Sequence, residues 1–112
     1  MKNSIHYSPE AQNDPDEIWE YITFELCNPQ AAENTVNKIM DTVDELENFS
    51  EIGAPLSSVT DIESDYRFLT SGNYIVFYRV NGQDVYVDRV LYGRWDYLRI
   101  LFPEPPQNDN EG

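Results

Sequence analysis

The sequence predicts an α+β domain in which a short N-terminal strand and two helices precede a three-stranded antiparallel sheet. Two observations lead to this fold class: apolar residues recur at helical spacing in the first half, and three runs rich in β-branched and aromatic residues fill the second half. A chain of 112 residues can bury one core. We therefore expect one domain over residues 1–102, followed by a disordered acidic tail, PEPPQNDNEG, at residues 103–112.

The N-terminal part is expected to contain a strand at Ser4–Tyr7, a short turn from Pro9, and a main helix from Pro15 to about Leu26. The run DPDE at residues 14–17 predicts that helix start, because an acidic cap, a proline at the first helical position and an acid three residues later form a capping signal. Helical spacing predicts that its buried stripe contains Ile18, Trp19, Ile22 and Leu26.

The second helix is predicted over residues 30–48, after the Asn28-Pro29 pair. One apolar stripe with steps of 4, 3, 4 and 3 runs along it: Ala32, Val36, Ile39, Val43 and Leu46. Because about two residues join the helices, they should form an antiparallel hairpin that lies on the sheet. Residues 49–65 are expected to form a mostly irregular connector.

The strands are expected at Tyr66–Thr70, Tyr74–Val80 and Val85–Tyr92. Gly72 should lie in the first turn, and Asn81-Gly82 predicts a type I′ hairpin with both residues at its centre. One face of the sheet should lie under the helices and the other should be partly open and aromatic. Strict alternation places Val85, Val87, Arg89 and Leu91 on one face of the last strand. Residues 95–102 could form a short helix or a further strand.

Composition narrows the function classes. The net charge is −14, and residues 1–60 contribute −10 of it, from 12 acidic and 2 basic residues. Such a chain is repelled from nucleic acid at long range, so we expect no direct nucleic-acid binding. With one Cys and one His in the chain, we expect no zinc site and no cofactor. Without an 18-residue apolar run or a signal-peptide core, we expect a cytoplasmic protein with no membrane partner.

Five of the seven basic residues lie in the strand region, and all are arginines: Arg67, Arg79, Arg89, Arg94 and Arg99. Two interpretations stay open. The strand arginines could pair with Asp65, Asp84 or Asp88 across the sheet, or they could hold the carboxylates of a partner, since a guanidinium binds a carboxylate through two parallel hydrogen bonds.

An ordered series of segments carries a family resemblance over nearly the whole chain: YSPEAQNDPDEIWEYI, NPQAAENTVNKI, FSEIGAPL, YRFLTSGNYIVFYRV and VYVDRVLYGRWDYLRILF. The sequence resembles the RelE/ParE superfamily of toxins from bacterial type II toxin–antitoxin modules. The resemblance implies the fold described above and a cognate antitoxin with an acidic C-terminal segment. It also implies one of two activities. RelE-like members cut messenger RNA on the ribosome, whereas ParE-like members bind DNA gyrase.

The positions that carry catalytic Arg and Tyr residues in RelE-like nucleases align with Ile75, Trp95 and Leu101. All three are apolar, so the resemblance favours the ParE-like branch, and we expect no catalytic residue. Family members often read Gly-Arg-Arg-Asp where this chain has Gly93-Arg94-Trp95-Asp96. Trp95 is either natural or an attenuating substitution.

The resemblance implies two sets of binding residues. We expect Arg67, Arg79 and Arg89 to bind the antitoxin, and Arg94, Trp95, Tyr97 and Arg99 to bind the target, DNA gyrase. Two alternatives stay open: a ribosome-dependent RelE-like endonuclease, and a non-toxic family member that acts only as an interaction protein.

Overall fold

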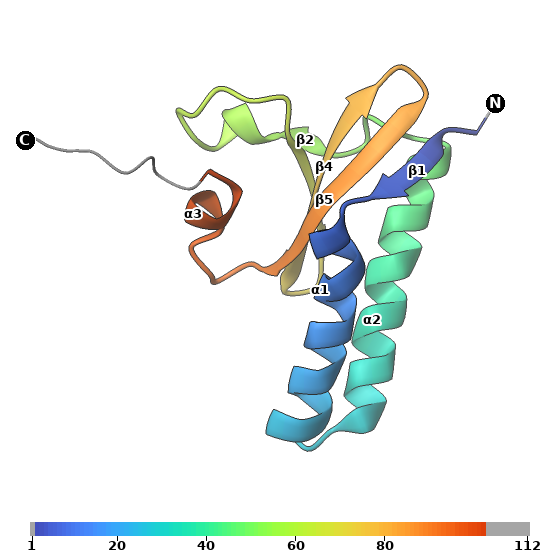
Figure 1. Ribbon diagram of the computed structural model, residues 1–112, viewed down its shortest axis with the longest axis vertical. Coiled ribbons are helices and arrows are strands. Elements are labelled where there is room, and N and C mark those ends of the chain that lie inside the picture. The colour runs from blue at the N-terminus through green and yellow to red at the C-terminus, as the bar shows by residue number, and fades with distance from the viewer. Residues whose placement is uncertain (1, 103–112) are drawn as a thin grey trace, which may run out of the picture.

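The sheet has five strands in the order β1-β5-β4-β3-β2 (Figure 1). The computed structural model describes residues 2–102, so the tail predicted at residues 103–112 lies outside the described residues. Strand β1 pairs with β5 in parallel, and the other pairs are antiparallel. The predicted α+β class is therefore confirmed, and the connector adds the short edge strand β2. The strands are β1 (Ser4–Tyr7), β2 (Ala54–Pro55), β3 (Arg67–Ser71), β4 (Tyr74–Asn81) and β5 (Asp84–Tyr92).

Helix α1 (Pro9–Glu20) begins six residues earlier than predicted and runs through Pro15. The hydroxyl of Ser8 caps it by accepting a hydrogen bond from the Ala11 N–H at 2.9 Å. The expected cap, Asp14, is buried inside the helix, where its carboxylate is bonded to strand β5. The capping signal at residues 14–17 was therefore misread, because Asp14 has a partner far away in the sequence.

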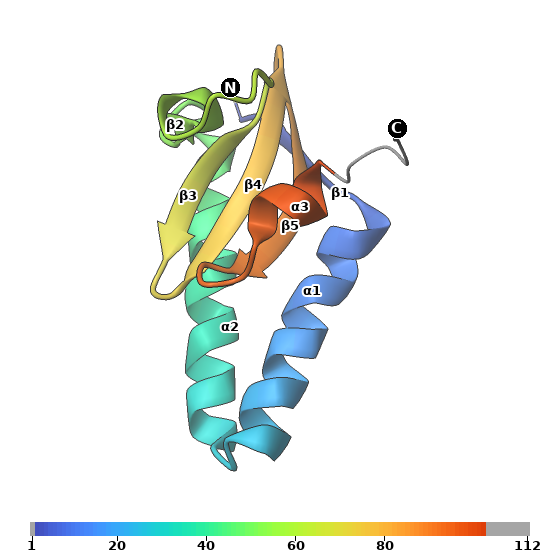
Figure 2. The ribbon, with the colours of Figure 1, turned by 90° about the vertical axis from the view of Figure 1, so that its left-hand side faces the viewer.

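The helical hairpin closes through a π-helical turn, η1 (Tyr21–Glu25), and Cys27, whose φ of 54° reverses the chain direction. Helix α2 (Pro29–Asp44) follows, capped by the side chain of Asn28, and ends in the 3₁₀ turn η2 (Glu45–Glu47). Figure 2 shows that the hairpin extends beyond the end of the sheet. Two residues of the predicted stripe, Trp19 and Leu26, are accordingly 40% and 57% exposed.

One face of the sheet, here called the hairpin face, packs against α1 and α2 (Figure 1). The core on this face contains the predicted stripe of α2 together with valines of β4 and β5. Its fully buried members include Ala32, Ile39, Val43, Leu46, Val76, Tyr78, Val85 and Val87. The α2 prediction is thus confirmed, since four of its five stripe residues are fully buried.

The opposite face, here called the open face, has a smaller core of Leu56, Phe77 and Leu91. It is covered by the 3₁₀ turn η3 (Leu56–Ser58) and by the short helix α3 (Tyr97–Leu101). The C-terminal segment, for which a helix and a strand were both possible, is therefore helical.

Two details of the sheet differ from the sequence prediction. Phe77 pairs with Arg89 but Tyr78 pairs with Val87, so a bulge at Asp88 interrupts the alternation of β5. Val90 therefore joins the hairpin-face core, while Leu91 packs on the open face. The second turn is also shifted by one residue. Asn81 pairs with Asp84, which leaves Gly82 and Gln83 at the centre of the turn. Gly82 has a φ of 64°, as the first central residue of a type II′ turn requires.

Candidate functional site

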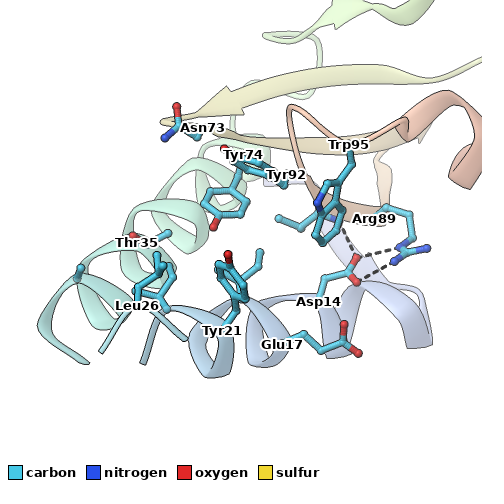
Figure 3. A pocket seen from close by; sticks show the side chains of 14 residues that line it. Asp14, Glu17, Tyr21, Leu26, Thr35, Asn73, Tyr74, Arg89, Tyr92 and Trp95 are labelled. Atoms are coloured by element: carbon cyan, nitrogen blue, oxygen red, sulfur yellow. Dashed lines mark hydrogen bonds and ion pairs between the residues drawn. The ribbon is translucent and has the colours of Figure 1, made fainter. Parts of the chain in front are cut away.

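A groove with a volume of about 600 Å³ lies where the helical hairpin outruns the sheet. One wall comes from α1, η1 and the first turns of α2, and the other comes from the ends of β4 and β5 and from Trp95. Figure 3 shows the side chains of Tyr21, Tyr74 and Trp95 around this space. A concave, largely apolar site with a few polar groups is typical of a binding site.

Aromatic rings dominate the sheet-side wall. The ring centroids of Tyr74 and Tyr92 are 5.6 Å apart, and Trp95 packs edge-on against Tyr92 at 6.1 Å. Trp95 and, across the groove, Tyr21 remain 52% and 55% exposed. Burial, followed by the nearby hydroxyls of Tyr92 and Tyr21, raises the pKa of Tyr74, so its hydroxyl is neutral at physiological pH. Exposed aromatic rings in a concave site suit a partner with apolar side chains.

A partly buried ion pair closes one end of the groove (Figure 3). The carboxylate of Asp14 accepts two hydrogen bonds from the guanidinium of Arg89, at 2.9 and 3.0 Å, and a third from the Val90 N–H at 2.8 Å. The side chain of Asp14 is 7% exposed and that of Arg89 is 27% exposed. The hydrogen bond to Asp14 raises the pKa of Arg89. This bidentate pair joins α1 to β5 and orients the wall of the groove.

The other two strand arginines that were expected to bind a partner also have internal contacts. Arg79 donates a hydrogen bond to Asp88 at 2.8 Å on the open face, and its guanidinium lies 5.8 Å from the centre of the Tyr66 ring. Arg67 donates to the backbone carbonyl oxygen of Gly53 at 2.6 Å. The cross-strand pairing that the sequence left open is thus found for Arg79. The structure does not bring the three arginines together on one surface.

The second predicted set, which follows β5, is also divided. Arg94 and Trp95 are exposed, and Trp95 lines the groove. Tyr97 packs on the open face with its ring 5.2 Å from that of Phe77. Arg99 forms an exposed ion pair with Asp96 at 3.2 Å. Trp95 is therefore the member of this set that the structure places in the groove.

The positions aligned with nuclease residues also lie in different places. Ile75 and Leu101 are partly buried against the open-face core, whereas Trp95 is in the groove. Within residues 2–102, no three His, Cys, Asp or Glu side chains are grouped so that they could hold a metal ion. Over the same range, every helix is too short or too polar to cross a membrane.

Sequence reasoning did not find the groove or the role of Asp14. The groove depends on how far the hairpin projects beyond the sheet. Asp14 lies 75 residues from Arg89 along the chain, so no local pattern links them. A helix interior that holds both an acid and a proline was the one available signal, and it was interpreted as a helix start.

Comparison with known proteins gives one consistent result. The family model for the ParE toxin of the type II toxin–antitoxin system parDE matches residues 5–97. Toxin ParE1 of Mycobacterium tuberculosis, in strains CDC 1551 / Oshkosh and ATCC 25618 / H37Rv, is 33% identical over 102 residues, which cover 90% of this chain and 100% of the relative.

A solved structure of the chromosomal ParDE toxin–antitoxin system from P. aeruginosa superposes with a TM-score of 0.68 at 22% identity, covering 81% of this chain and 96% of that one. That likeness shows the fold. The family match and the curated relatives go further, and the chain belongs to the ParE toxin family of type II toxin–antitoxin systems.

Proposed function

We propose that this toxin stops growth by binding DNA gyrase in the cytoplasm, without cutting nucleic acid, and that a cognate antitoxin neutralises it by occupying the groove. Family membership supports a toxin that has an antitoxin partner, since the solved P. aeruginosa relative is described as a toxin–antitoxin system. The proposal of gyrase as the target rests on the resemblance to the ParE-like branch.

The observation that carries binding over cleavage is the apolar chemistry of the three positions aligned with nuclease residues. Cleavage of RNA without a metal ion requires groups that activate the 2′-hydroxyl and stabilise charge on the phosphate. Ile75 and Leu101 can do neither, and their side chains pack partly buried on the open face. The net charge of −14 also opposes binding of ribosomal RNA.

Trp95 links the two proposed interactions. It belongs to the segment expected to contact the target, and it also forms part of the groove wall, where its ring is half exposed. An antitoxin segment in the groove would cover Trp95. The same indole cannot then contact gyrase, so occupation of the groove would block the toxin directly.

The test is controlled expression in bacteria of the chain as it stands and of the Trp95→Arg variant. Growth, induction of the DNA-damage response and messenger RNA length are followed together. Arrest with DNA damage and intact messages is the expected result. The variant should change the strength of the arrest, because Trp95 lies on the proposed working surface. Val59→Arg is the matched control, since Val59 is an exposed apolar residue in the connector.

Arrest with cut messages would contradict the proposal and favour a RelE-like nuclease. If neither version stops growth, the remaining function is that of a non-toxic interaction protein. The large acidic charge of the hairpin is the observation that favours this second candidate.

A further inference from the structure

We infer that the antitoxin segment in the groove is basic as well as apolar, and that it presents Lys or Arg to the α1 wall. This inference rests on the proposed function, because it takes the antitoxin as the occupant. It differs from the acidic segment that the family resemblance implied. The reason lies in the charges that this chain places around the groove.

The helical hairpin that supplies one wall carries one sign of charge, and two of its carboxylates, Asp14 and Glu17, line the groove itself. Residues 9–35, which form α1, η1, the hairpin loop and the first turns of α2, contain seven carboxylates and no Lys or Arg. Among residues 2–102, Asp14 is the only one of the seven with an ion-pair partner. The six others are Glu10, Asp16, Glu17, Glu20, Glu25 and Glu33. A segment that docks here therefore meets a strongly negative potential.

The end of the groove near Arg89 is also negative overall. The guanidinium of Arg89 already donates two hydrogen bonds to Asp14, and the carboxylates of Glu10 and Glu17 lie close enough to raise its pKa further. Three carboxylates thus act on one guanidinium, and Asp14 is the one that contacts it. Glu17 lines the groove, is exposed, and accepts a hydrogen bond from the neutral amide of Asn13 at 2.7 Å. A partner carboxylate would be repelled at this end, and an ammonium or guanidinium group would be attracted.

The expected contact between an acidic antitoxin segment and the strand arginines requires those arginines to be free. Each of the three now has an internal partner: Asp14 for Arg89, Asp88 for Arg79, and the Gly53 carbonyl oxygen for Arg67. A partner carboxylate would have to displace these contacts before binding.

Two other occupants have the wrong charge. A second copy of the chain would bring the same seven hairpin carboxylates against the groove. The last ten residues of the chain carry three acids and no base. Like charges brought together across an interface oppose association. Charge complementarity therefore selects a basic partner over either of them.

The first experiment identifies what lies in the groove. A photo-crosslinking residue, p-benzoylphenylalanine, replaces Tyr21 in the toxin, which is then purified with the protein encoded beside its gene. Mass spectrometry should find a crosslinked antitoxin peptide with more Lys and Arg than Asp and Glu. The same residue in place of Phe49, which is exposed and not among the residues that line the groove, is the control and should not capture that peptide.

The second experiment measures the charge preference. Two synthetic amphipathic helical peptides share their leucine positions, and their flanking positions carry either Lys or Glu. The Lys peptide should bind at least about tenfold more tightly, and added salt should reduce the difference. Glu17→Lys should weaken Lys-peptide binding about tenfold, because it places like charges together at the groove. Asp61→Lys makes the same charge change in the connector and should alter binding less than about twofold.

The outcomes separate the inference from the proposed function. Tyr21 crosslinking to an acidic antitoxin peptide, or tighter binding by the Glu peptide, overturns the inference and leaves neutralisation through the groove intact. Crosslinking to a second toxin chain also overturns the inference. If the antitoxin forms no complex, or forms one without any crosslink at Tyr21, the proposed neutralisation fails and the inference fails with it. Equal effects of Glu17→Lys and Asp61→Lys would show that the attraction is nonspecific and overturn the inference.

Discussion

The two faces of the sheet are covered in different ways, and the two Arg–Asp pairs beside them differ in exposure. On the hairpin face, α1 and α2 bury a large core, and the Asp14–Arg89 pair, which joins α1 to the edge of β5, is 7% and 27% exposed. On the open face, a helix of five residues covers three fully buried side chains, and the Asp88–Arg79 pair is 17% and 48% exposed. The same sheet therefore supports a firmly packed face and a lightly covered one.

This difference suggests where stability and proposed function reside. A helix as short as α3 is not stable by itself, so it depends on the contacts of Tyr97, Leu98 and Leu101 with the open face. A lightly packed element also opens locally at lower free energy than the core. The segment proposed to contact the target lies in and beside this element, whereas the hairpin face holds the fold together.

The largest expected difference comes from truncating one apolar side chain on each face. Ile39→Ala removes a fully buried side chain on the hairpin face and should lower the free energy of unfolding by about 2–5 kcal/mol. Leu98→Ala acts on a half-buried side chain of α3 and should lower it by about 1 kcal/mol. Denaturant unfolding of both variants measures the difference. Equal losses of unfolding free energy would show that the two faces contribute equally to stability.

The ion pairs extend the same comparison to polar contacts. Asp14→Asn removes the negative charge that all three donors around residue 14 contact and replaces one acceptor oxygen with an NH₂ group. It should lower the free energy of unfolding by about 1.5–3 kcal/mol. Asp88→Asn affects the more exposed pair and should cost less than about 1 kcal/mol. Thermal unfolding of the wild type, of the four single variants (Asp14→Asn, Arg89→Met, Asp88→Asn and Arg79→Met) and of the two double variants completes a double-mutant cycle for each pair. A larger coupling for Asp88–Arg79 would reverse the ranking.

A substitution at Gly53 tests how tightly the edge of the sheet is packed. Its N–H donates a hydrogen bond to the hydroxyl of Tyr78, a residue of the hairpin-face core, at 2.9 Å. A Cβ at this position would lie 2.6 Å from the Phe68 carbonyl oxygen and 2.7 Å from that hydroxyl. Gly53→Ala should therefore destabilise the protein by about 1–3 kcal/mol through overpacking.

The control for this substitution is Gly72→Ala, in the turn between β3 and β4. No atom lies within 4 Å of a Cβ built there, and only the positive φ of 60° opposes the change. That strain should cost about 1 kcal/mol. The denaturant midpoints of the two variants measure their losses of stability. A smaller loss of stability for Gly53→Ala than for Gly72→Ala would mean that the sheet edge moves readily to accommodate the added Cβ.

The smallest expected effect is a pH dependence on the open face. Burial, followed by the charge of Asp88, raises the pKa of Tyr66 from 10.0 to about 12. The folded protein therefore keeps this proton between pH 10 and 12, while the unfolded chain loses it. Stability contributed by Tyr66 is complete below pH 10 and is lost as the pH rises through about 12.

The free energy of unfolding of the wild type and of Tyr66→Phe, measured across this alkaline range, tests the predicted contribution of Tyr66. The variant should lose less stability than the wild type, since it has no phenol at residue 66 to titrate. Parallel profiles for the two proteins would show that Tyr66 does not contribute to the alkaline dependence.

Sequence patterns located most elements correctly because those patterns are local. The stripe of α2 requires only neighbours three and four residues apart, and Ile39 and Val43 are buried as expected. The errors occurred where two local signals competed. Ser8-Pro9 and Asp14-Pro15 both resemble helix starts, and the first is used because Asp14 binds Arg89. A single bulge at Asp88 likewise changed the faces of the residues that follow it.

The sequence by itself determined the fold class, the family and the acidic charge of the hairpin, since these depend on composition and on short-range order. Only the tertiary structure decided which carboxylate each arginine contacts and that Trp95 faces a groove. It also decided that Trp19 and Leu26 remain exposed. The physical reason is distance along the chain. Ion pairs, grooves and exposure depend on contacts between elements that folding brings together. The spacing of residues within one element does not reveal those contacts.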